Sequence, residues 1–316
     1  MSKKNVLIIG GLGFIGSHLA KECINNGYAV TILSRSKSKI ANISGFADKV
    51  ELIIKDLRDI SSEVEGFDYI FHLAGSKNNY VIIEDQPFND IELNCTCTIV
   101  LLEAIKKYNP SCSLYFASTI KVNGTPDKLP VNTSSPCNPL SLYGATRLAG
   151  EHFCQIYKNV FNLKTTIIRF TNIFGVKEAA NPKQAGFNYM IAQAVKGHDI
   201  NLYSNGDFFR DYLYVTDAAR ACLAIAEKGF AEQIYYVGRG EFIKFRKMAE
   251  IVAQQTGVNI KPVEPPDFHK RVGIKDFVCD NEPLKKLGWL PEVSMEEGIK
   301  KTIDYYRSLE GLDIGK

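Results

Sequence analysis

The stretch Val6-Leu7-Ile8-Ile9-Gly10-Gly11-Leu12-Gly13-Phe14-Ile15-Gly16 decides the fold of this chain. Its four leading apolar residues predict a strand that is buried on both faces, and a helical pattern follows over residues 17–26. Glycines in such a turn let the chain reverse and let backbone amides approach a pyrophosphate, which the helix N-terminus faces with its partial positive charge. The stretch therefore predicts a dinucleotide-binding turn. The residues expected to contact the cofactor there are Gly10, Gly13, Phe14, Ile15 and Gly16.

Alternating strand and helix patterns continue through the first half of the chain. Strands are expected over residues 28–33, 50–54, 67–73, 113–117 and 164–169, and helices over residues 93–108 and 142–158. Such an alternation predicts a parallel sheet with helices on both faces. We therefore expect an α/β fold with a Rossmann-type, doubly wound parallel sheet.

The pattern changes beyond about residue 170. A loop is expected near residues 179–186, helices over 187–196, 215–228, 245–255 and 294–309, and short strands near 200–202 and 234–237. We expect residues 1–175 to form the dinucleotide-binding domain, with later strands contributing to its sheet. Residues 176–316 are expected to form a smaller C-terminal substrate-binding lobe over the carboxyl ends of the strands, where ligands bind in such folds.

The composition excludes several classes of protein. The chain has 316 residues, 45% of them hydrophobic, and a net charge of +3, which is too small to indicate a nucleic-acid or anionic-membrane partner. No apolar run is long enough for a membrane span. The eight cysteines lack metal-ligand spacing, so we expect no metal site and free thiols in a reducing compartment. These features favour a cytoplasmic protein.

The end of the second expected strand bears on the choice of cofactor. An acidic residue at this place binds the ribose 2′-hydroxyl of NAD, whereas an arginine without the acid favours the 2′-phosphate of NADP. Here Ser34 stands in the place of the acid and Arg35 follows. The sequence therefore favours NADP and leaves NAD open, with Arg35 as a solvated loop residue as the alternative.

A tyrosine and a strand-end hydroxyl are candidates for catalysis. Tyr143 and Arg147 are four residues apart in an expected helix, so they share a face, and a neighbouring cation stabilises a phenolate. Thr119 ends a strand 24 residues before Tyr143 and could hydrogen-bond the same substrate oxygen. Tyr143 is therefore a candidate general acid or base, and an exposed Tyr–Arg pair is the alternative.

Several motifs together resemble a known family. They are Gly10-x-x-Gly13-x-x-Gly16, Asp56-Leu57-Arg58-Asp59, His72-Leu73-Ala74, Ser118-Thr119, Tyr143-x-x-x-Arg147 and the segments 169–175, 209–217, 271–273 and 287–291. The chain resembles the extended short-chain dehydrogenase/reductases. More narrowly, it is similar to the NAD-dependent epimerase/dehydratase group that acts on nucleotide sugars.

The resemblance implies roles for individual residues. The cofactor would take a hydride from C4 of the sugar, while Tyr143 removes the hydroxyl proton and Thr119 shares the hydrogen bond. Asp56 and Leu57 would lie at the adenine, and Leu73 and Ala74 near the middle of the cofactor. The residues expected to hold the diphosphate of a nucleoside-diphosphate sugar are Asn172, Arg210 and Arg271. His72 is expected to be a core histidine, and the family's dimerisation implies a homodimer.

Two departures from the family pattern affect the expected function. Arg147 replaces the family's lysine, which binds the nicotinamide ribose. Ile120 and Lys121 stand where the dehydratases carry an Asp-Glu pair, so 4,6-dehydration is not expected. The sequence therefore predicts an NAD(P)-dependent 4-epimerase or 4-ketoreductase of a nucleoside-diphosphate sugar. A catalytically impaired NADP(H)-binding regulator on the same fold is the alternative.

Overall fold

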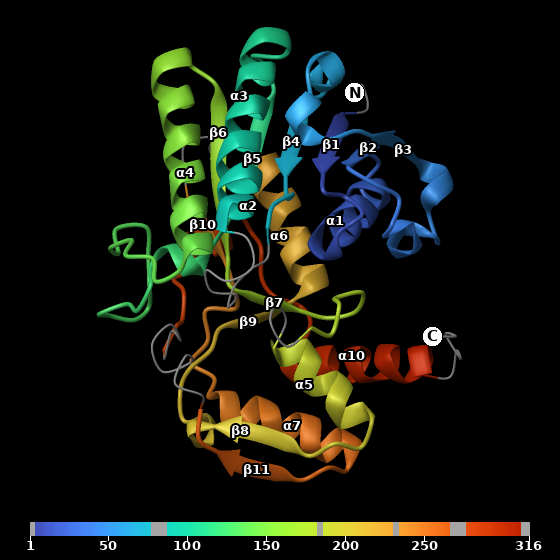
Figure 1. Ribbon diagram of the computed structural model, residues 1–316, viewed down its shortest axis with the longest axis vertical. Helices are drawn as coiled ribbons and strands as arrows, with labels where there is room; N and C mark the ends of the chain where they lie inside the picture. Colours follow the sequence, from blue (N-terminus) through green and yellow to red (C-terminus); the bar gives the residue numbers. More distant parts are fainter. Residues whose placement is uncertain (1–3, 77–86, 182–185, 230–233, 266–275, 311–316) are drawn as a thin grey trace.

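The computed structural model describes residues 4–76, 87–181, 186–229, 234–265 and 276–310, and Figure 1 traces the course of the chain. Its largest element is a seven-stranded sheet in which every neighbouring pair is parallel. The strands, in chain order, are β1 (Asn5–Ile9), β2 (Ala29–Ser34), β3 (Val50–Ile54), β4 (Tyr69–His72), β5 (Ser113–Thr119), β6 (Lys164–Phe170) and β10 (Ile234–Val237). Their spatial order is β10-β6-β5-β4-β1-β2-β3. The predicted Rossmann-type α/β fold is confirmed.

Strand β1 lies in the interior of this sheet because its side chains are apolar on both faces. Val6 and Ile8 pack in the hydrophobic cluster that contains helix α1 (Phe14–Asn25) and helix α6 (Val215–Lys228). Leu7 and Ile9 pack in the cluster on the opposite face, with α3 (Cys97–Tyr108) and α4 (Leu142–Phe161). This alternation follows the two-residue period of a strand. The strand order reverses between β1 and β4, which opens the crevice where ligands bind in such sheets.

Two helices differ from their predicted bounds near the site. Helix α1 begins at Phe14 instead of residue 17, because the amide of Ser17 already donates to the carbonyl of Gly13. The helix expected over residues 93–108 begins with a π-helical turn at Glu92–Thr96, continues as α3 and is preceded by the short helix α2 (Pro87–Ile91). The spacing of apolar residues does not reveal the wider π-helical turn, which is frequent at functional sites.

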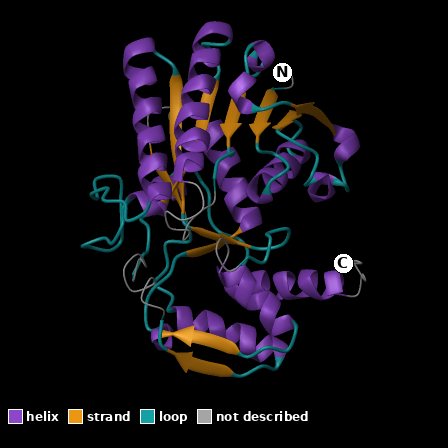
Figure 2. Cartoon of the chain, viewed as in Figure 1, coloured by secondary structure: helices purple, strands orange, loops and turns teal. Residues whose placement is uncertain are grey.

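Apart from α6 and β10, which pack with or belong to the large sheet, most of the later part of the chain lies beyond the carboxyl ends of that sheet (Figures 1 and 2). Its helices are α5 (Gly186–Val195), α7 (Phe245–Thr256), α9 (Glu282–Lys285) and α10 (Met295–Glu310). Its paired strands are β7 (Asn172–Phe174) with β9 (Tyr212–Tyr214), and β8 (Ile200–Tyr203) with β11 (Ile260–Val263). The sequence predicted β8 and the helices α5, α7 and α10. It did not predict the four-residue helix α9 or the strands β7, β9 and β11, which are three or four residues long.

Three observations bear on class and chemistry. In the described ranges no helix combines the length and apolarity that a membrane crossing requires. All eight cysteines lie in the described part of the chain and are free thiols. No group of His, Cys, Asp or Glu side chains among the described residues is arranged to hold a metal ion.

Candidate active site

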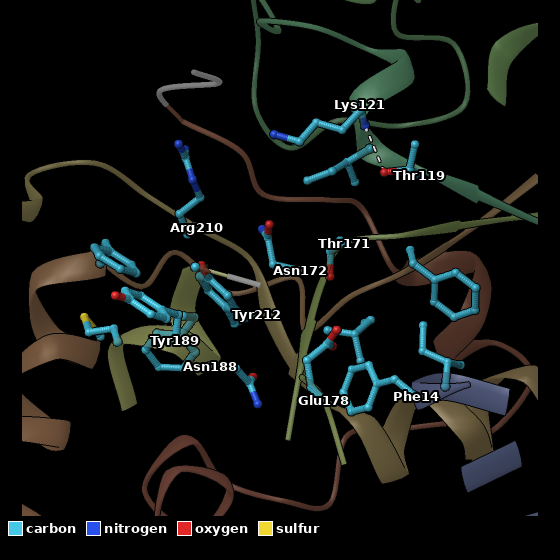
Figure 3. Close-up of a pocket in the computed structure, with 18 of the residues that line it drawn as sticks. Phe14, Thr119, Lys121, Thr171, Asn172, Glu178, Asn188, Tyr189, Arg210 and Tyr212 are labelled. Atoms are coloured by element: carbon cyan, nitrogen blue, oxygen red, sulfur yellow. Dashed lines mark hydrogen bonds between the residues drawn. The ribbon is translucent and has the colours of Figure 1, made fainter. Parts of the chain in front are cut away.

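A cavity of about 1040 Å³ lies between the carboxyl ends of the central strands and the C-terminal lobe. Figure 3 shows Thr119 and Lys121 on one side of it, Phe14 and Glu178 on the opposite side, and Arg210 beside Asn172. The sequence-predicted residues that line it are Gly10, Gly13, Phe14, Ile15, Gly16, Leu73, Thr119, Tyr143, Arg147, Asn172 and Arg210. One hollow therefore brings together the glycine turn, the candidate catalytic residues and two candidate phosphate ligands.

Other predicted site residues do not line this cavity. Ser34, Arg35, Asp56 and Leu57 lie where β2 and β3 end, at the far side of β1, and Ala74 follows β4 behind the cavity wall. The hydroxyl of Ser34 donates to the carbonyl of Ser36, 2.9 Å away. Arg35 is exposed. Arg271 lies outside the described residues.

The glycine turn between β1 and α1 is shaped by close backbone approaches. Gly10 has φ +85°, and a Cβ on it would lie 2.9 Å from the amide nitrogen of Ala74. A Cβ on Gly16 would lie 2.8 Å from the Cα of Gly11. Side chains at these positions would push the start of α1 away from the strand ends, so the space fits the backbone approach that a dinucleotide pyrophosphate needs.

Thr119 ends β5 and starts a short 3-10 helix. Its hydroxyl oxygen accepts a hydrogen bond of 3.3 Å from the amide of Lys121, as Figure 3 shows, and so caps the turn Ile120–Val122. The side chain is 9% exposed, on the cavity wall. The hydroxyl proton has no acceptor among the described residues, which leaves it available for an oxygen in the cavity.

The start of α4 fixes Tyr143 near Thr119. The hydroxyl of Ser141 accepts from the amide of Gly144 at 3.1 Å and caps the helix. Gly144 packs so closely on the segment after Thr119 that a Cβ there would lie 2.6 Å from the carbonyl oxygen of Lys121. Tyr143 is half-buried on the cavity wall, and its hydroxyl bonds to no described residue.

Arg147 is a buried residue of the cavity wall. It is 4% exposed, so the alternative of an exposed Tyr–Arg pair is wrong. Its Nη1 donates to the carbonyl of Ala117 at 3.0 Å and its Nη2 to the carbonyl of Ala74 at 3.3 Å. Its Cζ lies 5.7 Å from the centre of the Tyr143 ring, so a permanent charge is held one helical turn from the phenol.

A buried polar network behind β5 was not predicted. The Ser118 hydroxyl donates to Glu151, whose carboxylate pairs with Arg169 through bonds of 3.0 Å from Nε and 2.6 Å from Nη2. Arg169 Nη1 also donates to the hydroxyl of Tyr236 at 2.8 Å. Arg169 opens the segment 169–175 that contributes to the family resemblance, and its side chain is buried in the interior. The sequence feature that could have indicated this network is Glu151, an acidic residue eight positions after Tyr143 on the expected helix.

The substrate side of the cavity is built on the strands β7 and β9. They pair with each other in parallel, and their register puts Asn172 opposite Tyr212. Asn172 donates to the carbonyl of Asp211 from its amide at 3.1 Å and from Nδ2 at 3.0 Å. Arg210 precedes β9, and its guanidinium lies 4.6 Å from the centre of the Phe208 ring. Both side chains therefore face the cavity from anchored backbone.

Asp211 anchors this side of the site. Its carboxylate accepts from the backbone amides of Arg239, Gly240 and Cys279 at 2.7 to 3.1 Å. The side chain is 1% exposed, and burial raises the pKa of its carboxyl. Three separate segments thus meet at the residue after Arg210, which the motif did not reveal.

His72 is a core residue, as predicted. It is fully buried, its Nε2 lies 3.3 Å from the hydroxyl of Thr98, and burial lowers its pKa to about 3. It does not line the cavity.

Comparison with known proteins supports one family. The model of the NAD dependent epimerase/dehydratase family matches residues 6–238. A putative UDP-glucose 4-epimerase of Methanocaldococcus jannaschii is 27% identical, covering 96% of this chain and 98% of that protein. A UDP-N-acetyl-alpha-D-glucosaminuronate decarboxylase of Bacillus cytotoxicus is 30% identical, covering 98% and 99%. The crystal structure of a Thermus thermophilus UDP-glucose 4-epimerase in complex with NAD is 30% identical with a TM-score of 0.82, covering 96% and 99%. The chain belongs to the NAD dependent epimerase/dehydratase family.

Proposed function

We propose that this protein is an NAD-dependent enzyme that acts at C4 of a nucleoside-diphosphate sugar, as a 4-epimerase. The observation that carries the proposal is the convergence of the glycine turn, Thr119, Tyr143 and Arg147 on one cavity. Two relatives are named as UDP-glucose 4-epimerases, which supports a UDP-sugar substrate. A 4-ketoreductase is the neighbouring reaction on the same groups.

The chain's own residues divide the work at C4. Bound NAD would supply the hydride acceptor. Tyr143 would take the proton of the C4 hydroxyl and return it, while the Thr119 hydroxyl holds the same oxygen by a hydrogen bond. The Arg147 guanidinium, 5.7 Å from the centre of the Tyr143 ring, would keep a positive charge beside the phenol while the proton moves.

The diphosphate of the substrate would bind on the C-terminal side of the cavity. Arg210 carries a permanent positive charge there, and Asn172 has a second Nδ2 hydrogen beyond the one that it donates to Asp211. Arg271 is proposed as a further phosphate ligand from its motif alone. We also propose that residues 176–316 form the substrate lobe, apart from α6 and β10. Strand β10 is the edge strand of the large sheet, and α6 packs on one face of that sheet.

We propose NAD rather than NADP as the working cofactor. The Thermus thermophilus relative is in complex with NAD, and the comparisons give no support to the preference for NADP that Arg35 suggested. Hydrogen bonds from Arg58, with a smaller contribution from the charge of Arg35, lower the pKa of the Asp56 carboxyl to about 2, so Asp56 stays ionised. The negative charge of Asp56 is paired mainly with Arg58, at 2.9 Å, and would offset only in part the Arg35 charge that attracts a 2′-phosphate.

Residues 120 and 121 argue against dehydration. Ile120 carries no acid or base, and Lys121 lines the cavity with a positive charge where a dehydratase would place a carboxylate. A decarboxylase is among the relatives, so the substrate panel includes a uronic acid.

The experiment is an NMR assay of purified protein with NAD and UDP-glucose, UDP-N-acetylglucosamine or UDP-glucuronate. The expected result is the C4 epimer of one of them. Tyr143→Phe, which differs by one oxygen, should lower turnover by about a hundredfold while NAD binding remains. Turnover near the wild-type level in Tyr143→Phe would refute the mechanism. A second assay supplies NADH or NADPH with a nucleoside-diphosphate 4-keto sugar, and reduction there without epimerisation in the first assay would indicate the ketoreductase.

A regulator that binds the cofactor without catalysis is the second candidate. The buried, carbonyl-bound Arg147 in place of lysine is the observation that favours it. Such a regulator would bind dinucleotide but no nucleoside-diphosphate sugar. Thermal-shift screening with UDP, dTDP, GDP and CDP distinguishes the two, because stabilisation by any of these requires the substrate side of the cavity.

We also propose a homodimer through α3 and α4, which lie side by side in Figure 1. Large apolar side chains are exposed along these helices, among them Ile99, Ile156, Val160 and Phe161. Such a patch indicates an interaction surface. Sedimentation should therefore give a dimer that Val160→Asp weakens, and a monomeric wild-type protein at high concentration would refute it.

A further inference from the structure

Arg147 and Gly75 lie in direct steric contact. A Cβ built on Gly75 would lie 2.6 Å from Cζ of Arg147 and closer still to Nη2, whereas real Cβ atoms essentially never come within 3.0 Å of another heavy atom. The backbone of Gly75 is outside the left-handed region, so its conformation does not require glycine. A side chain is therefore excluded here by the guanidinium, which makes the closest approach, and by Asn94 Oδ1, which would lie 2.7 Å from the Cβ.

The guanidinium is not free to move aside. Arg147 is 4% exposed, and its Nη1 and Nη2 donate to Ala117 and Ala74, which lie at the ends of two different strands. Its Nε is buried and has no hydrogen-bond partner in the part of the chain that the structure describes. Losing either carbonyl would leave further buried donors unpaired, at a cost of about 1–3 kcal/mol for each.

The loop that carries Gly75 is also held. Asn94, in the π-helical turn, accepts from the amide of Ser76 at 3.1 Å through Oδ1 and donates to its hydroxyl at 3.0 Å. Its Nδ2 also donates to the Thr146 hydroxyl at 3.0 Å, one residue before Arg147. The loop and the start of α4 therefore share one buried asparagine, so neither partner of the Gly75–Arg147 contact retreats without breaking this link.

We propose that Gly75 is a positioning residue, matched to Arg147, that seats its guanidinium on the two strand-end carbonyls and thereby sets the charge beside Tyr143 and the cofactor site. Lysine at position 147 has no counterpart of Nη2, which makes the closest approach to Gly75, and its single flexible terminal nitrogen can shift by the few tenths of an ångström that the 2.6 Å approach at the Cζ position requires. The two positions therefore act as a pair, because Arg147 requires glycine at position 75, whereas lysine at position 147 does not. The proposal rests on the proposed function only in using NAD as the probe.

The test is a double-mutant cycle of wild type, Gly75→Ala, Arg147→Lys and the double variant. NAD dissociation constants and the midpoint of urea unfolding are measured for each. Gly75→Ala should weaken NAD binding by about tenfold or more beside Arg147 but by less than about threefold beside lysine. Gly45→Ala is the matched control, because a Cβ there has no atom within 4 Å and the backbone is outside the left-handed region.

Each outcome decides the inference. Equal losses of NAD affinity from Gly75→Ala beside arginine and beside lysine would overturn the pairing. They would mean that the added methyl group disturbs only the loop, through its 2.7 Å approach to Asn94 Oδ1. If Gly75→Ala does not fold, recovery of folding in the double variant supports the pairing and a second unfolded protein overturns it. If wild type binds no NAD, the proposed function fails, while the unfolding cycle still tests the contact.

Discussion

The Glu151–Arg169 pair should contribute strongly to stability, and Glu151→Gln tests this. The side chains are 1% and 3% exposed, and the carboxylate accepts from the Ser118 hydroxyl and twice from the guanidinium. Glutamine keeps the shape but removes the negative charge, leaving a buried guanidinium without its counter-charge. Breaking a buried pair in this way costs about 3–5 kcal/mol.

That loss is a large share of the stability of an ordinary protein, which is about 5–15 kcal/mol. The assay is urea unfolding followed by circular dichroism, because urea is uncharged and does not screen the pair. Glu297→Gln is the control: Glu297 pairs with Lys301 at 2.7 Å, but both side chains are about half exposed, so its removal should cost no more than about 0.5 kcal/mol.

The double variant Glu151→Gln/Arg169→Gln separates the pair from its surroundings. Once both charges are gone, no buried ion lacks a partner, so the double variant should lose clearly less free energy of unfolding than the sum of the single variants. A loss below about 1 kcal/mol for Glu151→Gln would refute the reasoning, because solvent would then have to reach the carboxylate.

Three further predictions concern the Thr119 hydroxyl, the choice of cofactor and the pH dependence of stability. Thr119→Val should lower turnover by about tenfold or more while Thr119→Ser keeps most of it, because only the hydroxyl is needed; steady-state kinetics on the two variants decides this, and similar rates would exclude the hydroxyl. Arg35→Ala should change the affinities for NAD and NADP by similar factors, measured by titration, if Asp56 offsets the arginine charge; a selective loss of NADP would restore the earlier interpretation of Arg35. His72 has its folded-state pKa lowered to about 3 by burial, so the unfolded chain binds its proton first as the pH falls. Lowering the pH from about 7.5 to about 5.5 should therefore remove about 1.3 kcal/mol of stability through His72. In His72→Gln, urea unfolding at both pH values should give a difference smaller by this amount, and an unchanged difference would contradict the buried, neutral histidine.

The large sheet could be predicted because its strands are apolar runs bounded by turn residues, most of them buried, with the edge strand β3 only partly so. The expected bounds of β3, α6 and β10 agree with the structure at both ends. The strands β7 and β9 were not predicted, because three residues are too few for a periodic signal, and their pairing joins segments forty residues apart. They nevertheless set Asn172 and Arg210 on the cavity wall.

Much of the candidate site could also be predicted, since its motifs lie at strand and helix ends that parallel topology brings to one edge. What could not be predicted was the role of residues that act through packing. Arg169 opens the segment 169–175, whose pattern does not say which way its side chain points, and the structure buries it against Glu151. Asn94 carried no signal, because its inward position depends on a π-helical turn.

The site is held together chiefly by approaches that admit no side chain. Gly16 brings α1 to the strand ends, Gly144 brings Tyr143 to the segment after Thr119, and Gly75 admits the Arg147 guanidinium. Each contact joins a different element to the same edge of the sheet, and none requires a left-handed backbone. A methyl group at each position should therefore perturb a different step: the cofactor phosphates at Gly16, proton transfer at Gly144, and the charge beside the phenol at Gly75. Even one added methylene is destabilising where packing is tight. The geometry of this site therefore depends on glycine at these three positions as much as on the hydroxyls that would do the chemistry.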